Sequence, residues 1–170
     1  MDQRLEAYLA KQDIYELCCC YMRGLDRLDK QLMLDQFWGD GWCEFGFHNS
    51  SPAAFIEFAM SALKEHAANQ HLIGNALIDI EDDEAFGEIY FQAYHKVPSE
   101  DGYEDLIIAG RYLDRYERRQ GTWKFAYRSE VVDWSRSTPT NDPYFELAPD
   151  GLRGARSEDA VYQRDKRRKP

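Results

Sequence analysis

The sequence has no long hydrophobic run, and this absence bounds where the protein works. None of its 170 residues falls in a stretch approaching the ~18 apolar residues that a membrane-spanning helix needs. The segment Met1–Glu6 is charged and lacks an apolar core, so we expect no signal peptide. Of four cysteines, three are consecutive, which is unlike a disulfide framework. We therefore predict a cytoplasmic protein with reduced thiols.

Positive charge and ligand-binding motifs are also scarce. The chain has 21 Lys and Arg against 31 Asp and Glu, a net charge of -10, which argues against nucleic acid or an anionic membrane as the main partner. No glycine-rich phosphate loop is present, so we expect no nucleotide cofactor. Metal-binding spacings such as CxxC and HExxH are missing, and three adjacent cysteines point in different directions around a helix. An iron triad of Asp26, His71 and His95 could be drawn, but we predict no metal and no cofactor.

The pattern of apolar residues changes along the chain. The length fits one domain, and a 44% hydrophobic share allows it to bury a core. A helical period predicts helices over 14–28, over 29–38 and from Ser51-Pro52 onward. A period of two then predicts strands over 71–80, 86–97, 104–117 and 122–134, besides an aromatic strand over 42–48. This order predicts an α+β fold: a cone-shaped barrel whose curved, mostly antiparallel sheet wraps a long N-terminal helix.

The composition divides the chain into two parts. Residues 1–135 form the predicted α+β barrel domain, and residues 136–170 form an irregular extension with a solvated basic tail over 164–169. The extension is expected to border the pocket, cross to a neighbour or cover its own sheet. Both faces of the predicted strand 104–117 are partly apolar, which favours a homodimer or homotrimer built sheet to sheet.

Asp26 is the first candidate for chemistry. It falls at the edge of the apolar stripe of the first helix, where a partly desolvated carboxylate can act as a base or an acid. The alternative is a surface Asp paired with Arg23 or Arg27. Tyr21 lies about 140° from Asp26 on an ideal helix. Both would therefore face one cavity only if the helix loosens near Gly24.

The strands supply three further candidates. His71 begins one strand and His95 ends the next, and together with a helix carboxylate they form a suggestive catalytic set. Each could instead be a structural histidine. Arg128 has inward parity on its strand and could stabilise negative charge. Its alternative role is an ion pair with Glu130 or a charge at the sheet edge. Aromatic residues make up 14% of the chain, and a cavity lined by some of them suits a flat aromatic ligand. The substrate-binding candidates are Trp42, Phe45, Tyr94 and Tyr112.

Five of these residues match a known pattern. Asp26 matches a helix aspartate, and His71, in a Gln-His-Leu-Ile-Gly segment, matches a catalytic histidine; His95 matches a second histidine. Arg128 follows a Gly-x-Trp-Lys-Phe segment as an arginine does in one relative, and Tyr21 precedes Asp26 in a Tyr-x-x-x-x-Asp pattern. Over residues 5–135 the chain thereby resembles the SnoaL-like branch of the nuclear-transport-factor-2-like superfamily. Scytalone dehydratase and hexachlorocyclohexane dehydrochlorinase give the best local matches.

The resemblance implies a cofactor-independent lyase acting on a small aromatic substrate. It implies that His71 moves a proton, that Asp26 orients its imidazole, that Tyr21 and His95 donate to a leaving oxygen, and that Arg128 stabilises negative charge. Phe45 stands where the dehydratase has a tyrosine, so the substrate does not transfer. Three alternatives stay open. They are retro-aldol release of formaldehyde from lignin-derived diaryl compounds, a non-catalytic binding domain, and a small subunit of a ring-hydroxylating dioxygenase.

Overall fold

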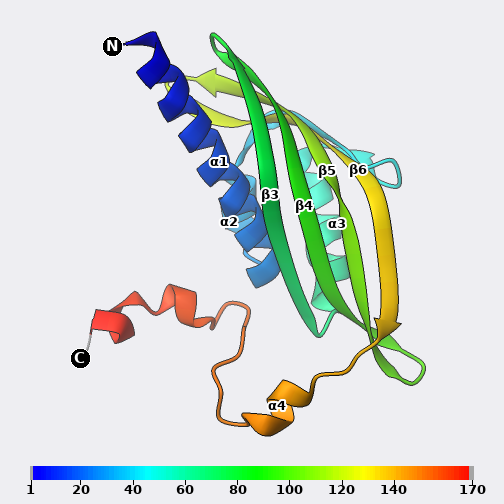
Figure 1. Ribbon diagram of the computed structural model, residues 1–170. Coiled ribbons are helices and arrows are strands. Elements are labelled where there is room, and N and C mark those ends of the chain that lie inside the picture. The colour runs from blue at the N-terminus through cyan, green and yellow to red at the C-terminus, as the bar shows by residue number, and fades with distance from the viewer. Residues whose placement is uncertain (1, 169–170) are drawn as a thin grey trace.

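The computed structural model describes residues 2–168 and confirms the α+β class (Figure 1). The N-terminal half contains α1 (Gln3–Arg27), α2 (Lys30–Leu34), β1 (Phe37–Glu44), β2 (Asn49–Ser50) and α3 (Pro52–Lys64). Four long strands follow: β3 (Ala68–Glu81), β4 (Glu84–Ser99), β5 (Gly102–Arg119) and β6 (Thr122–Pro139). The chain continues into α4 (Pro143–Leu147) and two 3-10 turns, Ala160–Tyr162 and Arg164–Arg168.

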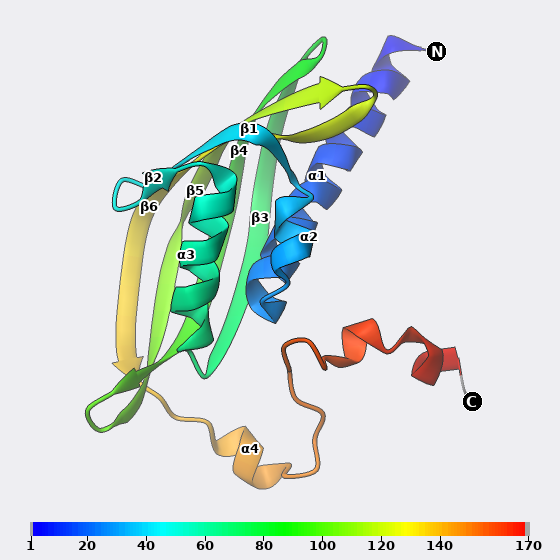
Figure 2. The same cartoon turned by 180° about the vertical axis from the view of Figure 1, so that it is seen from behind.

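All six strands form one curved sheet in the order β2-β1-β6-β5-β4-β3. The pairing of β1 with β6 is parallel, and the other neighbours are antiparallel. The views from the two sides show α3 lying against the concave face of the long strands, while α1 runs along β3 (Figures 1 and 2). The space between these helices and the sheet holds the core and the candidate site.

The long first helix is continuous through Gly24, so the loosening that would let Tyr21 and Asp26 face one cavity together does not occur. The Asp2 side chain accepts a hydrogen bond from the Arg4 backbone N–H and starts the helix, and Leu28 ends it in a left-handed conformation. A Cβ atom on Gly24 would lie 2.3 Å from Cγ of Met33. Glycine is thus needed because α1 and α2 approach closely, and the helix geometry is undisturbed.

Several predicted boundaries differ from the structure. The expected second helix over 29–38 ends at Leu34, and β1 begins at Phe37, so the Gly-Asp-Gly sequence at 39–41 lies inside a strand. Gly41 fits because a Cβ there would be 3.1 Å from the Ala126 carbonyl oxygen of β6. At the other end, β6 continues to Pro139, into the start of the predicted extension.

The segment after β6 has little regular structure: α4 and two short 3-10 turns. Residues 164–168 of the predicted basic tail are exposed, while residues 169 and 170 lie outside the described residues. Among residues 2–168, none of the helices has both the length and the apolar character needed to cross a membrane.

Candidate functional site

A cavity of about 250 Å³ lies between α1, α3 and the concave face of the sheet. Most of its wall is apolar and includes the side chains of Phe45, Phe55 and Phe91. Five polar residues also line it: Tyr21, His71, His95, Tyr112 and Glu130. An apolar cavity with a few convergent polar groups is the usual form of a small-molecule site.

Two of the predicted residues meet at one end of the cavity. His71 Nδ1 lies 2.7 Å from Asp26 Oδ1, and the His71 backbone N–H donates to both carboxylate oxygens at 3.0 and 3.2 Å. Asp26 is in the last turn of α1 and His71 is near the start of β3, so two rigid elements hold the contact. With Nδ1 donating to the carboxylate, Nε2 carries the lone pair that can accept a proton.

This contact also explains how residues on different sides of α1 serve one site. Tyr21 lines the cavity directly, whereas Asp26 reaches it only through His71. On its other side Asp26 borders a wider pocket of about 430 Å³, formed by α1, β3 and the C-terminal extension. No loosening of the helix is required.

His95 lies beside His71, as the sequence suggested. Their ring centroids are 5.1 Å apart, and His66 is placed equally, 5.1 Å from His95 on its other side. The Asn69 amide lies 3.4 Å from His95 Nδ1. Burial and the two neighbouring histidines lower the pKa of His95 to about 3. His95 is therefore a neutral imidazole at neutral pH.

Arg128 is in a different environment from the one expected. It is fully buried and does not line the cavity. Its Nε and Nη2 donate to Asp114 at 2.8 and 2.7 Å, and its guanidinium carbon lies 4.0 to 4.2 Å from the ring centroids of three aromatic residues. These are Tyr21, Tyr112 and Phe125. Two corrections follow: Arg128 cannot contact an anion in the cavity, and its partner is Asp114 rather than Glu130.

The aromatic candidates divide evenly. Phe45 and Tyr112 line the cavity. Trp42 is 46% exposed and lies outside the cavity, because it alternates in direction with its buried neighbour Cys43. Tyr94 also points away and donates its hydroxyl hydrogen bond to Asp105 at 2.8 Å. The structure thus corrects the placement of Trp42 and Tyr94 in the substrate site.

Glu130 is a cavity residue that the sequence did not single out for a role of its own. It lies on β6 opposite Tyr112 of β5. Burial raises its pKa to about 7, against a smaller lowering by the charge of Arg128. Glu130 shares its inward parity with Arg128, and this parity indicates a side chain that faces the cavity side of the sheet. From the sequence alone, Glu130 is interpreted only as an ion-pair partner of Arg128.

The extension contributes a second residue that the sequence did not reveal. Arg156 Nη1 donates to the Asp26 carbonyl oxygen at 2.8 Å, and Nη2 donates to the carbonyls of His66 at 3.1 Å and Leu63 at 3.4 Å. The Asn69 amide, with its oxygen turned towards Arg156, accepts at 2.7 Å. A cation at the C-terminal ends of α1 and α3 complements both helix dipoles. Through Arg156, the extension therefore holds the end of α1 that carries the Asp26–His71 pair, which we call the dyad.

Comparison with known proteins adds family information. Residues 6–129 match the model of the SnoaL-like domain. A hexachlorocyclohexane dehydrochlorinase from Novosphingobium barchaimii is 17% identical, with a TM-score of 0.72 over 82% of this chain and 97% of that chain. A scytalone dehydratase-like protein from Novosphingobium aromaticivorans is 19% identical, with a TM-score of 0.70 over 79% and 91%. A protein of unknown function from Mycobacterium tuberculosis is 25% identical, with a TM-score of 0.66 over 85% and 81%. Among curated proteins the sequence has no match.

Proposed function

The chain belongs to the SnoaL-like domain family, and on this premise we propose that it is a cofactor-independent lyase acting on a small aromatic compound. The reaction we favour is elimination of water, as in a dehydratase. One observation carries the proposal: the 2.7 Å contact between His71 Nδ1 and Asp26 stands at the wall of an aromatic-lined cavity. A carboxylate that orients a histidine is the usual arrangement of a general base.

The proposed reaction begins at His71. Its Nε2 takes a proton from a carbon atom of the substrate, and the Asp26 carboxylate stabilises the imidazolium that forms. The electron pair of the broken C–H bond becomes the new double bond, and the C–O bond breaks with its pair on oxygen. Tyr21 and His95 donate hydrogen bonds towards that oxygen. A positioned proton-transfer group of this kind contributes about 10²–10⁴ in rate.

Arg128 takes an indirect part in this proposal. Its guanidinium lies behind the rings of Tyr21 and Tyr112, at 4.2 and 4.1 Å from their centroids. It fixes the direction of two rings that line the cavity. We therefore assign it to positioning rather than to contact with the substrate.

The alternative lyase reaction is a retro-aldol cleavage that releases formaldehyde. It would use the same base and the same donors, because it also starts with proton removal and ends with a stabilised oxygen. The size of the cavity distinguishes the two substrates. A volume of about 250 Å³ is below the ~300–1,000 Å³ of most drug-sized sites and suits a one-ring compound better than a diaryl one.

The test is a turnover screen. Aromatic compounds with a hydroxyl group one carbon away from an acidic C–H are incubated with the protein and with the His71→Ala variant. Growth of ultraviolet absorbance reports a new conjugated double bond, and a trapping reagent reports formaldehyde. Water loss that requires His71 supports the proposal, and formaldehyde release supports the alternative. A compound that binds without reacting would indicate a non-catalytic binding domain.

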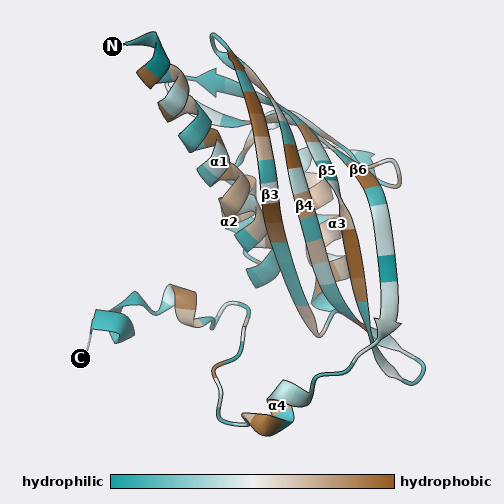
Figure 3. Ribbon diagram, in the orientation of Figure 1, coloured by the Kyte–Doolittle hydropathy of each residue, from teal (hydrophilic) through white to brown (hydrophobic). Residues whose placement is uncertain are grey.

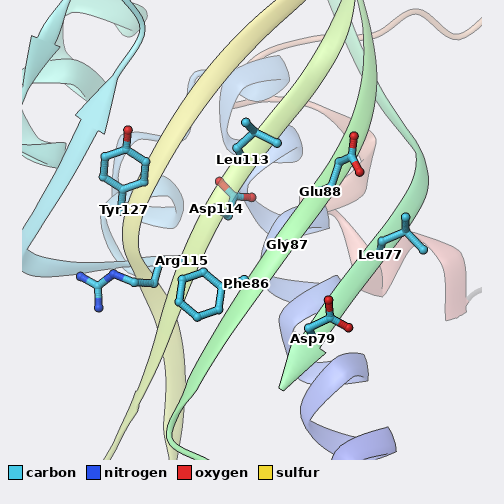
Figure 4. A pocket seen from close by; sticks show the side chains of 9 residues that line it. All are labelled: Leu77, Asp79, Phe86, Gly87, Glu88, Leu113, Asp114, Arg115 and Tyr127. Carbon is cyan, nitrogen blue, oxygen red and sulfur yellow. The ribbon is translucent and has the colours of Figure 1, made fainter. Parts of the chain in front are cut away.

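We also propose that the protein is a homodimer or homotrimer that assembles through the outer face of its sheet. Leu77, Phe86 and Leu113 lie on three adjacent strands there and are 64%, 43% and 39% exposed, around a shallow pocket of about 510 Å³ (Figure 4). The ribbon coloured by hydropathy shows apolar residues along β3, β4 and β5 (Figure 3). An apolar patch of this kind is normally covered in a soluble assembly. Light scattering at micromolar concentration should give two or three times 19.9 kDa; a mass of 19.9 kDa would reject the proposal.

A further inference from the structure

The cavity wall contains one carboxyl group, and it stands far from the dyad in the sheet. Glu130 is on β6, three strands away from β3, which carries His71. Its side chain lines the same cavity as His71 and lies opposite Tyr112 in the β5–β6 register. A ligand that fills the cavity therefore meets the His71 imidazole from β3 on one side and the Glu130 carboxyl group from β6 on the other.

Within residues 2–168, no cation forms an ion pair with the Glu130 side chain. Arg128, two residues earlier on the same face, is committed to Asp114 through two hydrogen bonds at 2.8 and 2.7 Å. Asp114 also accepts from Tyr116 at 2.7 Å. Nη1 of Arg128 makes no hydrogen bond to any of the described residues. In the same part of the chain, residues 2–168, the side chain of Glu130 makes no hydrogen bond or ion pair. Its carboxyl group is thus left for whatever occupies the cavity.

We propose that Glu130 is a protonated carboxyl group that donates a hydrogen bond to an oxygen atom of the ligand, across the cavity from His71. The ligand class that follows is an aromatic compound carrying an oxygen acceptor on the side that faces Glu130, opposite the C–H bond from which His71 removes a proton. Only the catalytic part of this assignment rests on the proposed lyase function. As a binding contact it stands on the cavity alone.

The chemistry of the neighbouring groups supports this role. The titratable and charged groups around Glu130 are Arg128 on β6, Tyr112 on β5, Tyr21 on α1, and the two histidines across the cavity. Burial raises the pKa values of Tyr21 and Tyr112 above the usual range of a phenol, and the pKa of His95 falls to about 3. Glu130, with its pKa raised to about 7, is better matched to give up a proton near neutrality than any of these three.

The elimination then balances without an added reagent. His71 Nε2 takes the C–H proton, the C–H electron pair forms the double bond, and the C–O bond breaks. The leaving hydroxyl takes its proton from Glu130 and departs as water. Transfer of the proton from His71 to Glu130 through solvent restores both groups for the next turnover.

The first experiment measures the protonation of Glu130 directly. Carboxyl-carbon NMR of the uniformly labelled protein is recorded against pH and compared with Glu130→Gln, which keeps the shape and loses the titration. The expected result is one carboxyl resonance that titrates near pH 7 in the wild type and is missing from the variant. Titration of that resonance near the ordinary glutamate value of about 4.3 would overturn the assignment.

The second experiment measures binding and needs no turnover. Benzoate is the probe, because it stays anionic near neutral pH, and benzamide is its neutral counterpart. Wild-type affinity for benzoate should fall about tenfold between about pH 6 and pH 8.5, since loss of the Glu130 proton removes a hydrogen bond to a charged group. Glu130→Gln should bind benzoate with no such fall, and benzamide should show little pH dependence in either protein.

Other outcomes reject the assignment. If the fall persists in Glu130→Gln and disappears in His71→Gln, the titrating group is His71. If the folded wild type does not bind benzoate at any pH, the carboxyl group does not receive a ligand oxygen. Both experiments can succeed in a protein that catalyses nothing, whereas the His71→Ala turnover test can fail without affecting them. The two proposals are therefore rejected by different results.

Discussion

The protein contains two buried pairs of an acid with a nitrogen base, and they differ in what surrounds them. Asp26 and His71 meet at the cavity wall, with side chains 11% and 6% exposed, whereas Asp114 and Arg128 are completely covered. Both contacts are 2.7 Å long. Distance alone therefore does not tell a reactive pair from a structural one.

The difference lies in the capacity to change protonation. A guanidinium does not lose its proton in a protein, and here it is held by two hydrogen bonds and surrounded by three aromatic rings. An imidazole gains and loses a proton near neutral pH, and Nε2 of His71 is free of the bond to Asp26. The Asp114–Arg128 pair can only stabilise the core, whereas the Asp26–His71 pair contains the imidazole that we propose as the proton carrier.

Removing the imidazole of the reactive pair should have the largest effect. We expect His71→Ala to lower turnover by about 10²–10⁴ because the general base is lost, with little change in stability. Steady-state kinetics and circular dichroism measure the two properties. His66→Ala is the matched control, because His66 belongs to the same row of histidines but does not line the cavity. Activity within a few-fold of the wild type in a folded His71→Ala protein would show that His71 is not the base.

Breaking the Asp114–Arg128 pair, which we call the sealed pair because both side chains are completely covered, should lower stability rather than turnover. Asp114→Asn leaves the Arg128 charge buried without its counter-ion, which should cost about 3–5 kcal/mol of unfolding free energy. Denaturant titration measures the loss. Asp133→Asn is the control: it removes an exposed partner of Arg111 and should cost about 0–1 kcal/mol. Equal losses of unfolding free energy in Asp114→Asn and Asp133→Asn would show that burial does not distinguish the Asp114–Arg128 pair from the Asp133–Arg111 pair.

Arg156 tests whether the reactive pair depends on the extension. Arg156→Gln removes a charged donor from the carbonyls of Asp26, Leu63 and His66, and should cost about 1–3 kcal/mol. We also expect kcat to fall a few-fold more than KM changes, because the base loses its alignment, and Arg156→Lys should restore part of kcat. Arg153→Gln, in the same extension, is the control. A loss of stability with unchanged kcat would limit Arg156 to a structural role.

Chelation should have the smallest effect. In our proposal the His71 imidazole carries a proton and binds no metal. Within residues 2–168, no group of three or more His, Cys, Asp or Glu residues is arranged to hold a metal ion. Dialysis against a chelator should leave kcat within experimental error. Loss of activity that returns with stoichiometric iron or zinc would reassign the dyad.

The sequence allowed the reactive pair to be predicted, but not the sealed one. Asp26 follows from its position at the edge of the helix stripe, and His71 follows from the family resemblance of its segment. Arg128 was expected to face inward, which is correct. Its partner depends on the register that places Asp114 opposite it, 14 residues away, and alternation within one strand carries no information about register. The nearer acid, Glu130, was considered instead.

Strand alternation itself could have refined the aromatic candidates. Trp42 and Phe45 are three positions apart, so an extended strand directs them to opposite faces. The same holds for the adjacent Tyr94 and His95. Only Phe45 and His95 of these pairs line the cavity. The contacts of Arg156 could not be predicted, because an irregular segment has no period that relates it to distant residues.

The contact between Arg156 and Asp26 also sets an order in time. Its two residues are separated by 130 positions. At typical synthesis rates of about 5–20 residues per second, the carboxylate leaves the ribosome on the order of ten seconds before the arginine that braces it. A nascent chain therefore presents the first helix, and then most of the sheet, before the brace can form. Premature termination between the end of β6 and Arg156 would leave the Asp26–His71 pair without this contact.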